Sequence, residues 1–259
     1  MSSKYLGKGL NKVEAIVTTS WDDGHILDLK IADLLKELGL KGTFYVVAGY
    51  IKAESPGFLG REEVRTLISE GFEVGSHGYT HFKLTSLSLD VAKEELVLSK
   101  RILEDELKCK VHGFSYPQGV FNEELMKLTK IVGYEYARTM NRFTTRIEDP
   151  FKVGITVHAY PYSFRKNVKA IKFTRKLAAL SRWAELGKEL FNYVLRWGGV
   201  WHLAGHSWEI EYFNLWNELR ELLEYVANRD GVHYVTNLEA VKMSLKLTNL
   251  SHRELLKYS

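Results

Sequence analysis

Two adjacent carboxylates and a glycine, Asp22-Asp23-Gly24, stand where a predicted strand passes into a predicted helix. Residues 14–17 form a largely β-branched run that predicts a buried strand, and the apolar residues after Gly24 recur at helical spacing. Strand ends are where α/β folds place their chemistry. Consecutive strand residues point to opposite faces, so both carboxylates can face one cavity only if the chain turns here, which Gly24 permits. Crowded carboxylates repel each other, and we therefore expect a cation beside them.

Strand-like and helix-like segments alternate along the chain, which predicts a parallel sheet wrapped by helices. Seven or eight such units in 259 residues favour an α/β fold of the irregular (β/α)7-8 barrel type over an open sheet. Asn122 and Asn237 are expected to cap helices, and residues 163–197 are expected to form one long or broken helical region. After the first strand, further strands are expected at 41–47, 72–77, 111–117, 134–140, 152–158, 200–206 and 233–236.

Composition excludes several classes of protein. A hydrophobic content of 45% allows a sizeable core, and we expect a single catalytic domain over residues 1–259 with a helical insertion at about 163–197. A formal charge of +4 is too small to indicate nucleic acid as a partner. Cys109 is the only cysteine, which rules out an internal disulfide framework or a Cys-rich zinc module. Residues Met1–Lys12 lack an apolar signal-peptide core and no run is long enough to span a bilayer, so we expect a cytoplasmic protein.

A pair of histidines follows the third predicted strand. His77 and His81 are four residues apart and converge if the chain turns helically after the strand. Together with Asp23 they would form a two-His-one-carboxylate set that leaves metal positions open for water and substrate. Two histidines at this spacing can also be structural. Their place at a strand end, matching that of the paired aspartates, favours a metal site.

Two further strand ends carry polar residues. His206 follows the apolar run 200–204 and Gly205, and a general acid there would complete the chemistry of a metal-assisted hydrolysis. Pro117 and Gly119 fix a turn after another strand and could direct a backbone N–H at the cavity, as an oxyanion donor. A satisfied structural histidine and an ordinary rigid turn are the alternatives.

These motifs together resemble the polysaccharide deacetylases, carbohydrate esterase family 4. The family's Thr-Phe-Asp-Asp-Gly motif appears as residues 20–24, its His-Ser/Thr-x-x-His motif as residues 77–81, and its Leu-x-x-His motif as residues 203–206. The resemblance implies an incomplete (β/α) barrel and a metal-dependent enzyme that removes N-acetyl groups from an amino sugar or glycan by hydrolysing a linear amide. It implies one divalent ion, usually Zn²⁺ and sometimes Co²⁺ or Ni²⁺. The implied ligands are Asp23, His77 and His81, with Asp22 as the base and His206 as the acid.

The chain departs from the family pattern at two motifs. The family's Arg-x-Pro-Tyr becomes Ser115-Tyr116-Pro117-Gln118, so the arginine that tunes the base is missing, although the backbone N–H of Gln118 remains. We hypothesise that Arg138, near the end of the next strand, replaces that arginine; an ordinary surface arginine is the alternative. The Asp-x-x-Asp-Trp motif has no clean match, which leaves the acid that orients His206 unassigned. The departures leave open hydrolysis of another C–N bond, such as a cyclic amide or ureide, or a non-catalytic carbohydrate-binding role.

Other candidates carry weaker signals. Tyr116, Gln118 and Trp208 are candidate substrate contacts or tuning residues, and Glu209 could meet substrate or close the barrel mouth. The histidines at positions 112, 158, 202 and 233 are expected to be structural.

The region 163–197 is basic and amphipathic. Arg165, Lys169, Lys172 and Lys176 would share one stripe of a helix, and an apolar stripe that includes Leu177 and Phe191 would share another. The interpretation we favour is a helix that packs on the barrel with a solvated basic face. The alternatives are a lid, a homodimer surface or a surface that attracts anionic substrate or an acidic membrane.

Overall fold

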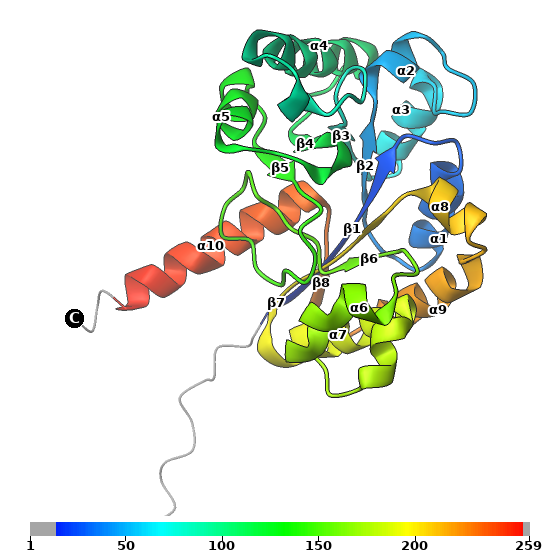
Figure 1. Cartoon of the computed structure of the whole chain (residues 1–259), viewed down its shortest axis with the longest axis vertical. Helices are drawn as coiled ribbons and strands as arrows, with labels where there is room; N and C mark the ends of the chain where they lie inside the picture. Colours follow the sequence, from blue (N-terminus) through cyan, green and yellow to red (C-terminus); the bar gives the residue numbers. More distant parts are fainter. Residues whose placement is uncertain (1–13, 256–259) are drawn as a thin grey trace, which may run out of the picture.

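Strand β1 (Ala15–Asp23) lies in the middle of one curled, parallel sheet in the computed structural model, which describes residues 14–255 (Figure 1). Its first eight residues are buried, as expected for a strand covered on both faces. The strand order is β5-β4-β3-β2-β1-β7-β6, and β8 pairs with the beginning of β1. The other strands are β2 (Thr43–Val46), β3 (Glu73–Ser76), β4 (Gly113–Ser115), β5 (Tyr136–Arg138), β6 (Val157–His158), β7 (Gly199–Gly205) and β8 (Val232–Tyr234).

An irregular segment, rather than a regular strand pair, links the two edges of the sheet. The N–H of Thr139 donates to the carbonyl of Val153 over 2.7 Å, which attaches the segment to the end of β5. The N–H of Thr156 donates to the carbonyl of His202 over 2.8 Å, which attaches it to β7. The sheet therefore curls into an incomplete barrel, and the predicted irregular (β/α) barrel is confirmed.

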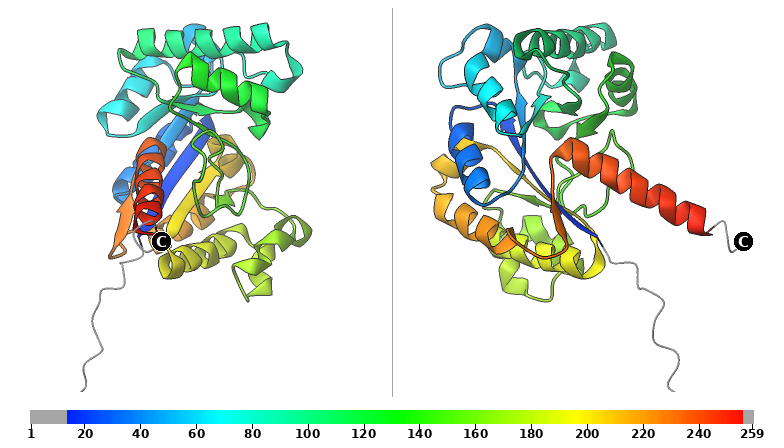
Figure 2. Two further views of the ribbon diagram at one scale, coloured as in Figure 1. Left: turned by 90° about the vertical axis from the view of Figure 1, so that its left-hand side faces the viewer. Right: turned by 180° about the vertical axis from the view of Figure 1, so that it is seen from behind.

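Helices cover the outside of the sheet, with α4 and α5 on one side of the molecule and α6 and α7 on the other, while α10 extends away from the barrel (Figures 1 and 2). The sequence did not predict α2 and α8, because segments of five and six residues are too short to show a helical period. The α-helices are α1 (Asp28–Glu37), α2 (Ala48–Lys52), α3 (Arg61–Ser69), α4 (Leu89–Leu107), α5 (Glu123–Val132), α6 (Phe164–Asn167), α7 (Trp183–Trp197), α8 (Ser207–Tyr212), α9 (Trp216–Val226) and α10 (Asn237–Leu255).

The predicted N-terminal cap is present at helix α5 and absent at helix α10. Asn122 caps α5 as predicted, since its Oδ1 accepts a hydrogen bond from the N–H of Leu125 over 2.8 Å. Asn237 does not cap α10. Its side chain points into the barrel and bonds to the hydroxyls of Thr18 and Tyr45. Thr236 and Glu239 supply the cap through reciprocal bonds to each other's N–H groups.

The region 163–197 is broken rather than continuous. It consists of α6, two 3₁₀ turns (Val168–Lys172 and Leu177–Ser181) and α7. The amide of Asn167 donates to the carbonyl of Leu180 over 2.8 Å, which holds the chain in a fold-back that one straight helix could not make. The predicted stripes therefore do not lie on one helix. Leu177, expected on the packed stripe, is exposed, whereas Phe191 of α7 is buried as predicted.

Within residues 14–255 no helix combines the length and hydropathy that a membrane span requires. Residues Met1–Lys12, on which the prediction of no signal peptide depends, lie outside the described residues.

Candidate active site

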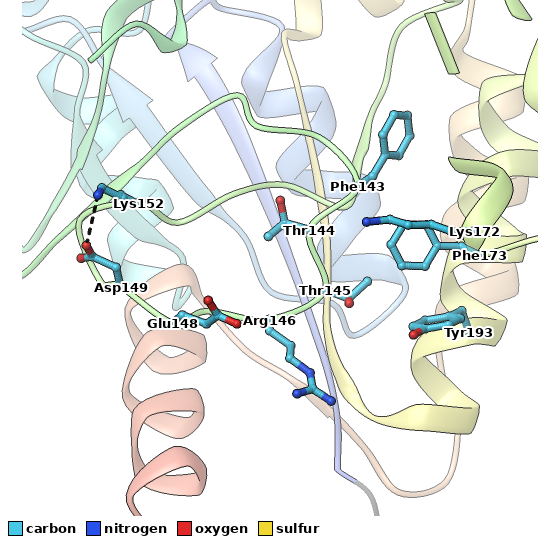
Figure 3. Close-up of a pocket in the computed structure, with 10 residues that line it drawn as sticks. All are labelled: Phe143, Thr144, Thr145, Arg146, Glu148, Asp149, Lys152, Lys172, Phe173 and Tyr193. Carbon is cyan, nitrogen blue, oxygen red and sulfur yellow. Dashed lines mark ion pairs between the residues drawn. The ribbon is translucent and has the colours of Figure 1, made fainter. Parts of the chain in front are cut away.

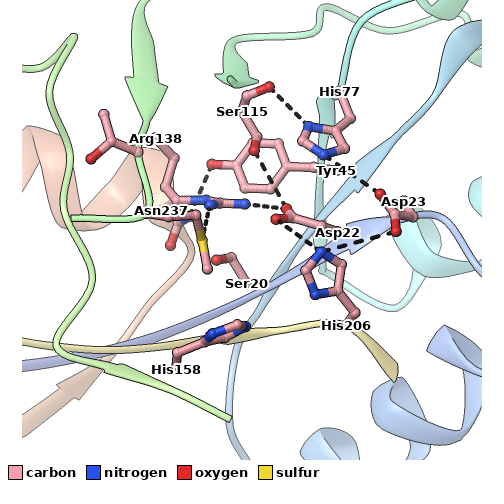
Figure 4. A network of polar contacts seen from close by, with 12 residues as sticks. Ser20, Asp22, Asp23, Tyr45, His77, Ser115, Arg138, His158, His206 and Asn237 are labelled. Atoms are coloured by element: carbon pink, nitrogen blue, oxygen red, sulfur yellow. Dashed lines mark hydrogen bonds and ion pairs between the residues drawn. The ribbon is translucent and has the colours of Figure 1, made fainter. Parts of the chain in front are cut away.

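The carboxyl ends of five strands of the sheet bring the polar candidates together (Figure 4). Asp22 and Asp23 end β1, and His77 directly follows β3. Ser115 and Arg138 end β4 and β5, while His206 directly follows β7. In a parallel barrel the carboxyl ends of all strands meet at one rim, so residues far apart in sequence face a common space.

Three ligand-type atoms converge at this rim. Asp23 Oδ1 lies 3.6 Å from His77 Nε2 and 3.3 Å from His81 Nε2. This oxygen is buried and has no hydrogen-bond partner among the described residues, although it faces two imidazoles. This carboxylate oxygen and the two ring nitrogens form an N/N/O donor set that suits a divalent cation. Further coordination positions of such an ion would be open to water or substrate.

The ring of His77 is held in the tautomer that a ligand needs. Its Nδ1 donates to the backbone carbonyl of Ser115 over 2.9 Å, so Nε2 is left with a free lone pair. Burial lowers the pKa of His77 to about 4, which keeps the ring neutral at physiological pH. Neutral imidazole is the form that binds metals.

Both Asp23 and His81 have unusual backbone conformations. Asp23 has φ of 79° and His81 has φ of 65°, in the left-handed region that non-glycine residues rarely adopt. The turn that the sequence placed at Gly24 is present, since Gly24 has φ of 69°, and the left-handed backbone already begins at Asp23, the last residue of β1. Such strain costs about 1–3 kcal/mol per residue and clusters at functional sites, because there a particular side-chain direction is needed.

Asp22 makes a buried ion pair with Arg138. An Nη2 hydrogen of Arg138 is donated to Asp22 Oδ1, and the hydroxyl of Ser115 lies 3.5 Å from the same oxygen. Burial would raise the pKa of Asp22, but the guanidinium of Arg138, followed by the rings of His77 and His206, holds it well below its usual range. Asp22 is therefore an oriented, ionised carboxylate.

The register of the sheet explains how Arg138 reaches Asp22. Ser115 of β4 pairs directly with Arg138 of β5, so the guanidinium comes from the position beside Ser115 on the next strand. The Arg138 side chain is fully buried and lies over the ring of Tyr45, 5.3 Å from its centroid. The alternative of a surface arginine is wrong, because the structure buries Arg138 at the candidate site.

His206 is oriented by an acid that the sequence left unassigned. Its Nδ1 donates to Glu209 Oε2 over 2.7 Å, and its Nε2 lies 3.9 Å from Asp22 Oδ2. Burial lowers the pKa of His206, but the bond to Glu209 and the charges of Asp22 and Asp23 raise it to about 9. The ring is therefore protonated at neutral pH, with Nε2 directed at the paired aspartates. A glutamate three residues after a histidine at a helix start was the available sequence signal.

His158 contacts Glu209 and so belongs to the polar network around His206, which we call the active-site network, rather than to an unrelated part of the core. Its Nε2 lies 3.5 Å from Glu209 Oε2, and its Nδ1 is 3.0 Å from the hydroxyl of Tyr162. Ligand-type atoms of His158, His206 and Glu209 also cluster closely enough to hold a metal. The short bond from His206 already occupies the carboxylate of Glu209, whereas Asp23 Oδ1 has no such partner. We therefore regard the Asp23 set as the better metal candidate.

The remaining sequence candidates differ in where they lie relative to the candidate active site. Trp208 lies at the rim, where its Nε1 donates to Asp23 Oδ2 over 3.0 Å. Gln118 is exposed in the turn after β4 and has φ of 59°. Tyr116 does not reach the site: its side chain is fully buried, stacks on Phe121 and bonds to a backbone carbonyl, so the prediction of a substrate contact is wrong.

Asp28 is a buried carboxyl that the sequence did not single out. Neither of its oxygens has a hydrogen-bond partner among the described residues. Burial raises its pKa well above the usual value; the nearby hydroxyl of Ser207 opposes this in part, and the charges of Asp23 and Asp22 raise the pKa further. An aspartate in the first turn of a helix is ordinarily exposed and stabilised by the helix dipole, which is why its position gave no signal.

An open groove of about 540 Å³ lies apart from these residues (Figure 3). It runs between the loop that carries Phe143 and Asp149 and the side chains of Lys172, Phe173 and Tyr193. None of the paired aspartates or the metal-candidate histidines lines it. The groove is therefore not part of the candidate active site.

Comparison with known proteins gives one family match. The family model described as polysaccharide deacetylase matches residues 10–137, which include the paired aspartates and both metal-candidate histidines. Arg138, His206 and Glu209 lie beyond the matched residues.

Two curated relatives and one solved structure illustrate the similarity. YxkH of Bacillus subtilis is 27% identical over 127 residues, which cover 49% of this chain and 45% of YxkH. The peptidoglycan-N-acetylmuramic acid deacetylase PdaA of the same organism is 28% identical over 134 residues, covering 51% of this chain and 48% of PdaA. This chain thus spans about half the length of these relatives. A Mycobacterium smegmatis structure assigned to the polysaccharide deacetylases has a TM-score of 0.69 at 18% identity, covering 93% of this chain and 94% of its own, which shows a shared fold.

Proposed function

Since the chain belongs to the polysaccharide deacetylase family, we propose that it is a metal-dependent hydrolase that removes N-acetyl groups from an amino sugar or glycan. The observation that carries this proposal is the meeting of an oriented base, a protonated acid and an N/N/O donor set at one rim. The curated relative PdaA is by name a peptidoglycan deacetylase, which supports an acetylated glycan as the substrate class. We further propose that residues 1–259 act as one catalytic domain with a helical insertion, and that the protein works in the cytoplasm.

We assign Asp23, His77 and His81 as ligands of one divalent metal, with Zn²⁺ as the first choice because N/N/O sites of this kind suit it. When bound, such an ion supplies Lewis acidity that polarises an amide carbonyl and lowers the pKa of water. Trp208 restrains Asp23 through the bond to Oδ2, which leaves Oδ1 directed at the two histidines.

The remaining steps belong to the side chains of this chain. Asp22, held ionised by Arg138, accepts a proton from the attacking water as that water adds to the acetamide carbonyl. His206, held protonated by Glu209, donates its proton to the departing nitrogen, so the products are acetate and a free amine. The two groups have pKa values pushed in opposite directions from their usual values, which is the arrangement that acid–base catalysis requires.

The test is an assay of acetate release from a panel of N-acetylated amino sugars and oligosaccharides, with Zn²⁺, Co²⁺ or Ni²⁺ added to metal-free protein. We expect acetate release by the parent and almost none by Asp22→Asn, because an amide cannot accept the water's proton. Asp22→Asn should still bind metal, whereas Asp23→Asn should bind it weakly. Full activity in Asp22→Asn, or ring opening of cyclic amides without acetate release, would overturn the proposal.

A further inference from the structure

The surface formed by residues 164–177, which we call the basic–apolar surface, has no role in the proposed chemistry. It comprises α6, the 3₁₀ turn Val168–Lys172 and the chain up to Leu177. In Figure 2 this yellow-green region stands out from the body of the molecule beside α7. Its composition and exposure together point to a partner.

Charge is concentrated here. The stretch 163–184, which contains this surface and extends past it to include Arg182, holds seven of the 36 Lys and Arg residues and none of the 32 Asp and Glu residues. The rest of the chain consequently has a net charge of −3, although the whole chain carries +4. Within the described residues, only Lys176 of these seven cations makes an ion pair, with Glu189 over 2.7 Å. The other six present their charge to solvent.

Large apolar side chains are interleaved with these cations. Phe164, Val168, Ile171 and Leu177 are between 42% and 53% exposed. They account for a quarter of the sixteen exposed large hydrophobic side chains recorded among residues 14–247, within only fourteen residues. Exposed apolar side chains grouped in this way mark an interaction surface, since isolated ones would need no explanation.

The backbone beneath the surface is anchored to the barrel near the candidate active site. Arg142 donates to Asn167 Oδ1 over 2.9 Å and to the carbonyl of Lys166 over 2.8 Å. The guanidinium of Arg142 also lies over the ring of Tyr162, which bonds to His158 of the active-site network. The surface is therefore pre-organised and is linked to the active-site rim through a short chain of contacts.

We propose that the basic–apolar surface docks peripherally on a bilayer that contains anionic lipids. Cations facing anionic headgroups, with aliphatic and aromatic side chains entering the acyl boundary, are the pattern of interfacial membrane attachment. A second copy of this chain fits less well, because a two-fold interface would place two strongly positive surfaces against each other. Nucleic acid also fits less well, because three of the four exposed apolar side chains are aliphatic and cannot stack on bases.

The test is sedimentation of the full chain with vesicles of phosphatidylcholine alone or mixed with phosphatidylglycerol, at low and high salt. We expect binding to the anionic vesicles only, and weaker binding at high salt because screening shortens the reach of the charges. Lys169→Gln/Lys172→Gln/Arg175→Gln should reduce the partition coefficient by about tenfold or more. Ile171→Ser/Leu177→Ser should reduce it as well, at both salt concentrations.

A matched control removes three exposed cations from α4 and α5, on the other side of the molecule (Figure 1): Lys93→Gln/Lys127→Gln/Lys130→Gln. This variant has the same net charge as the first and should bind like the parent. Equal loss in both triple variants would mean that net charge, not this surface, drives binding. The proposal would be overturned if the parent did not bind vesicles or bound neutral vesicles equally well. It would also be overturned if Ile171→Ser/Leu177→Ser bound normally, or if the parent bound duplex DNA tightly without binding vesicles. None of these measurements depends on catalytic activity.

Discussion

The guanidinium of Arg138 donates to the carboxylate of Asp22 inside the barrel, although three strands, β4, β3 and β2, separate β5 from β1 in the sheet order. Both side chains are almost completely buried. A buried ion pair of this kind contributes little net stability compared with apolar packing, but loss of one partner leaves an uncompensated charge. The pair therefore matters chiefly for the ionisation and orientation of Asp22.

Arg138→Met should raise the pKa of Asp22, because burial would then act without the compensating guanidinium. The acidic limb of the kcat/KM profile should move to higher pH, since Asp22 would be protonated, and inactive as a base, over a wider range. Stability near neutral pH should fall by about 3–5 kcal/mol, the cost of an unpaired buried charge. Arg138→Lys, which keeps the charge, should shift the limb less. An unchanged acidic limb in Arg138→Met would reject the tuning role.

His77→Ala should lower metal content and deacetylase activity together. The substitution removes one of three converging donors, while Asp23 and His81 alone form an incomplete site. Metal per chain can be measured by atomic emission after dialysis against a defined Zn²⁺ concentration. His112→Ala is the control, because His112 pairs with Glu135 away from the site and should keep full metal content. Metal retention at the parental level in His77→Ala would show that the ligand assignment is wrong.

Glu209→Gln should lower the pKa of His206, because the charged hydrogen-bond partner that raises it is lost. Above the new pKa His206 is neutral and cannot donate a proton, so the basic limb of the rate profile should move to lower pH. The titration of the His206 ring can be followed by NMR in metal-free protein, where its surroundings raise the pKa of His206 to about 9. Glu211→Gln, which alters a neighbouring exposed acid, should leave the pKa of His206 unchanged. A His206 pKa that does not move in Glu209→Gln contradicts the orienting role.

Asp28→Asn should remove a pH-dependent loss of stability. The folded pKa of Asp28 is raised above the ordinary 3.8, so the unfolded chain releases the proton first as pH rises. The contribution of Asp28 to stability is consequently greatest below pH 3.8 and falls until the folded group ionises, by up to about 1.4 kcal/mol per pH unit. Urea unfolding of metal-free protein at several pH values should show this decline in the parent and not in Asp28→Asn. Asp33 is exposed, so Asp33→Asn is the control and should decline like the parent. If stability declines identically in Asp28→Asn and in the parent, Asp28 is not the cause of the decline.

Periodicity and strand-end motifs predicted most of the framework. The predicted ranges overlap all eight strands. For β1 to β7 the reason is that burial in a parallel sheet imposes a local composition that the chain itself displays, whereas β8 is only partly buried. Asp22, Asp23, His77, His81 and His206 were identified because each follows or ends such a run. Short helices and the broken region 163–197 were not resolved, since their conformation depends on contacts such as that of Asn167 with Leu180.

The amino-acid sequence by itself determined the barrel class and indicated the candidate reactive side chains, because both depend on residues that are neighbours along the chain. Tertiary structure alone decided that Arg138 meets Asp22, that Glu209 orients His206 with His158 behind it, and that Tyr116 turns into the core. Those outcomes depend on strand register and on which face a side chain takes. A shift of one residue reverses that face, and only the packed sheet fixes it.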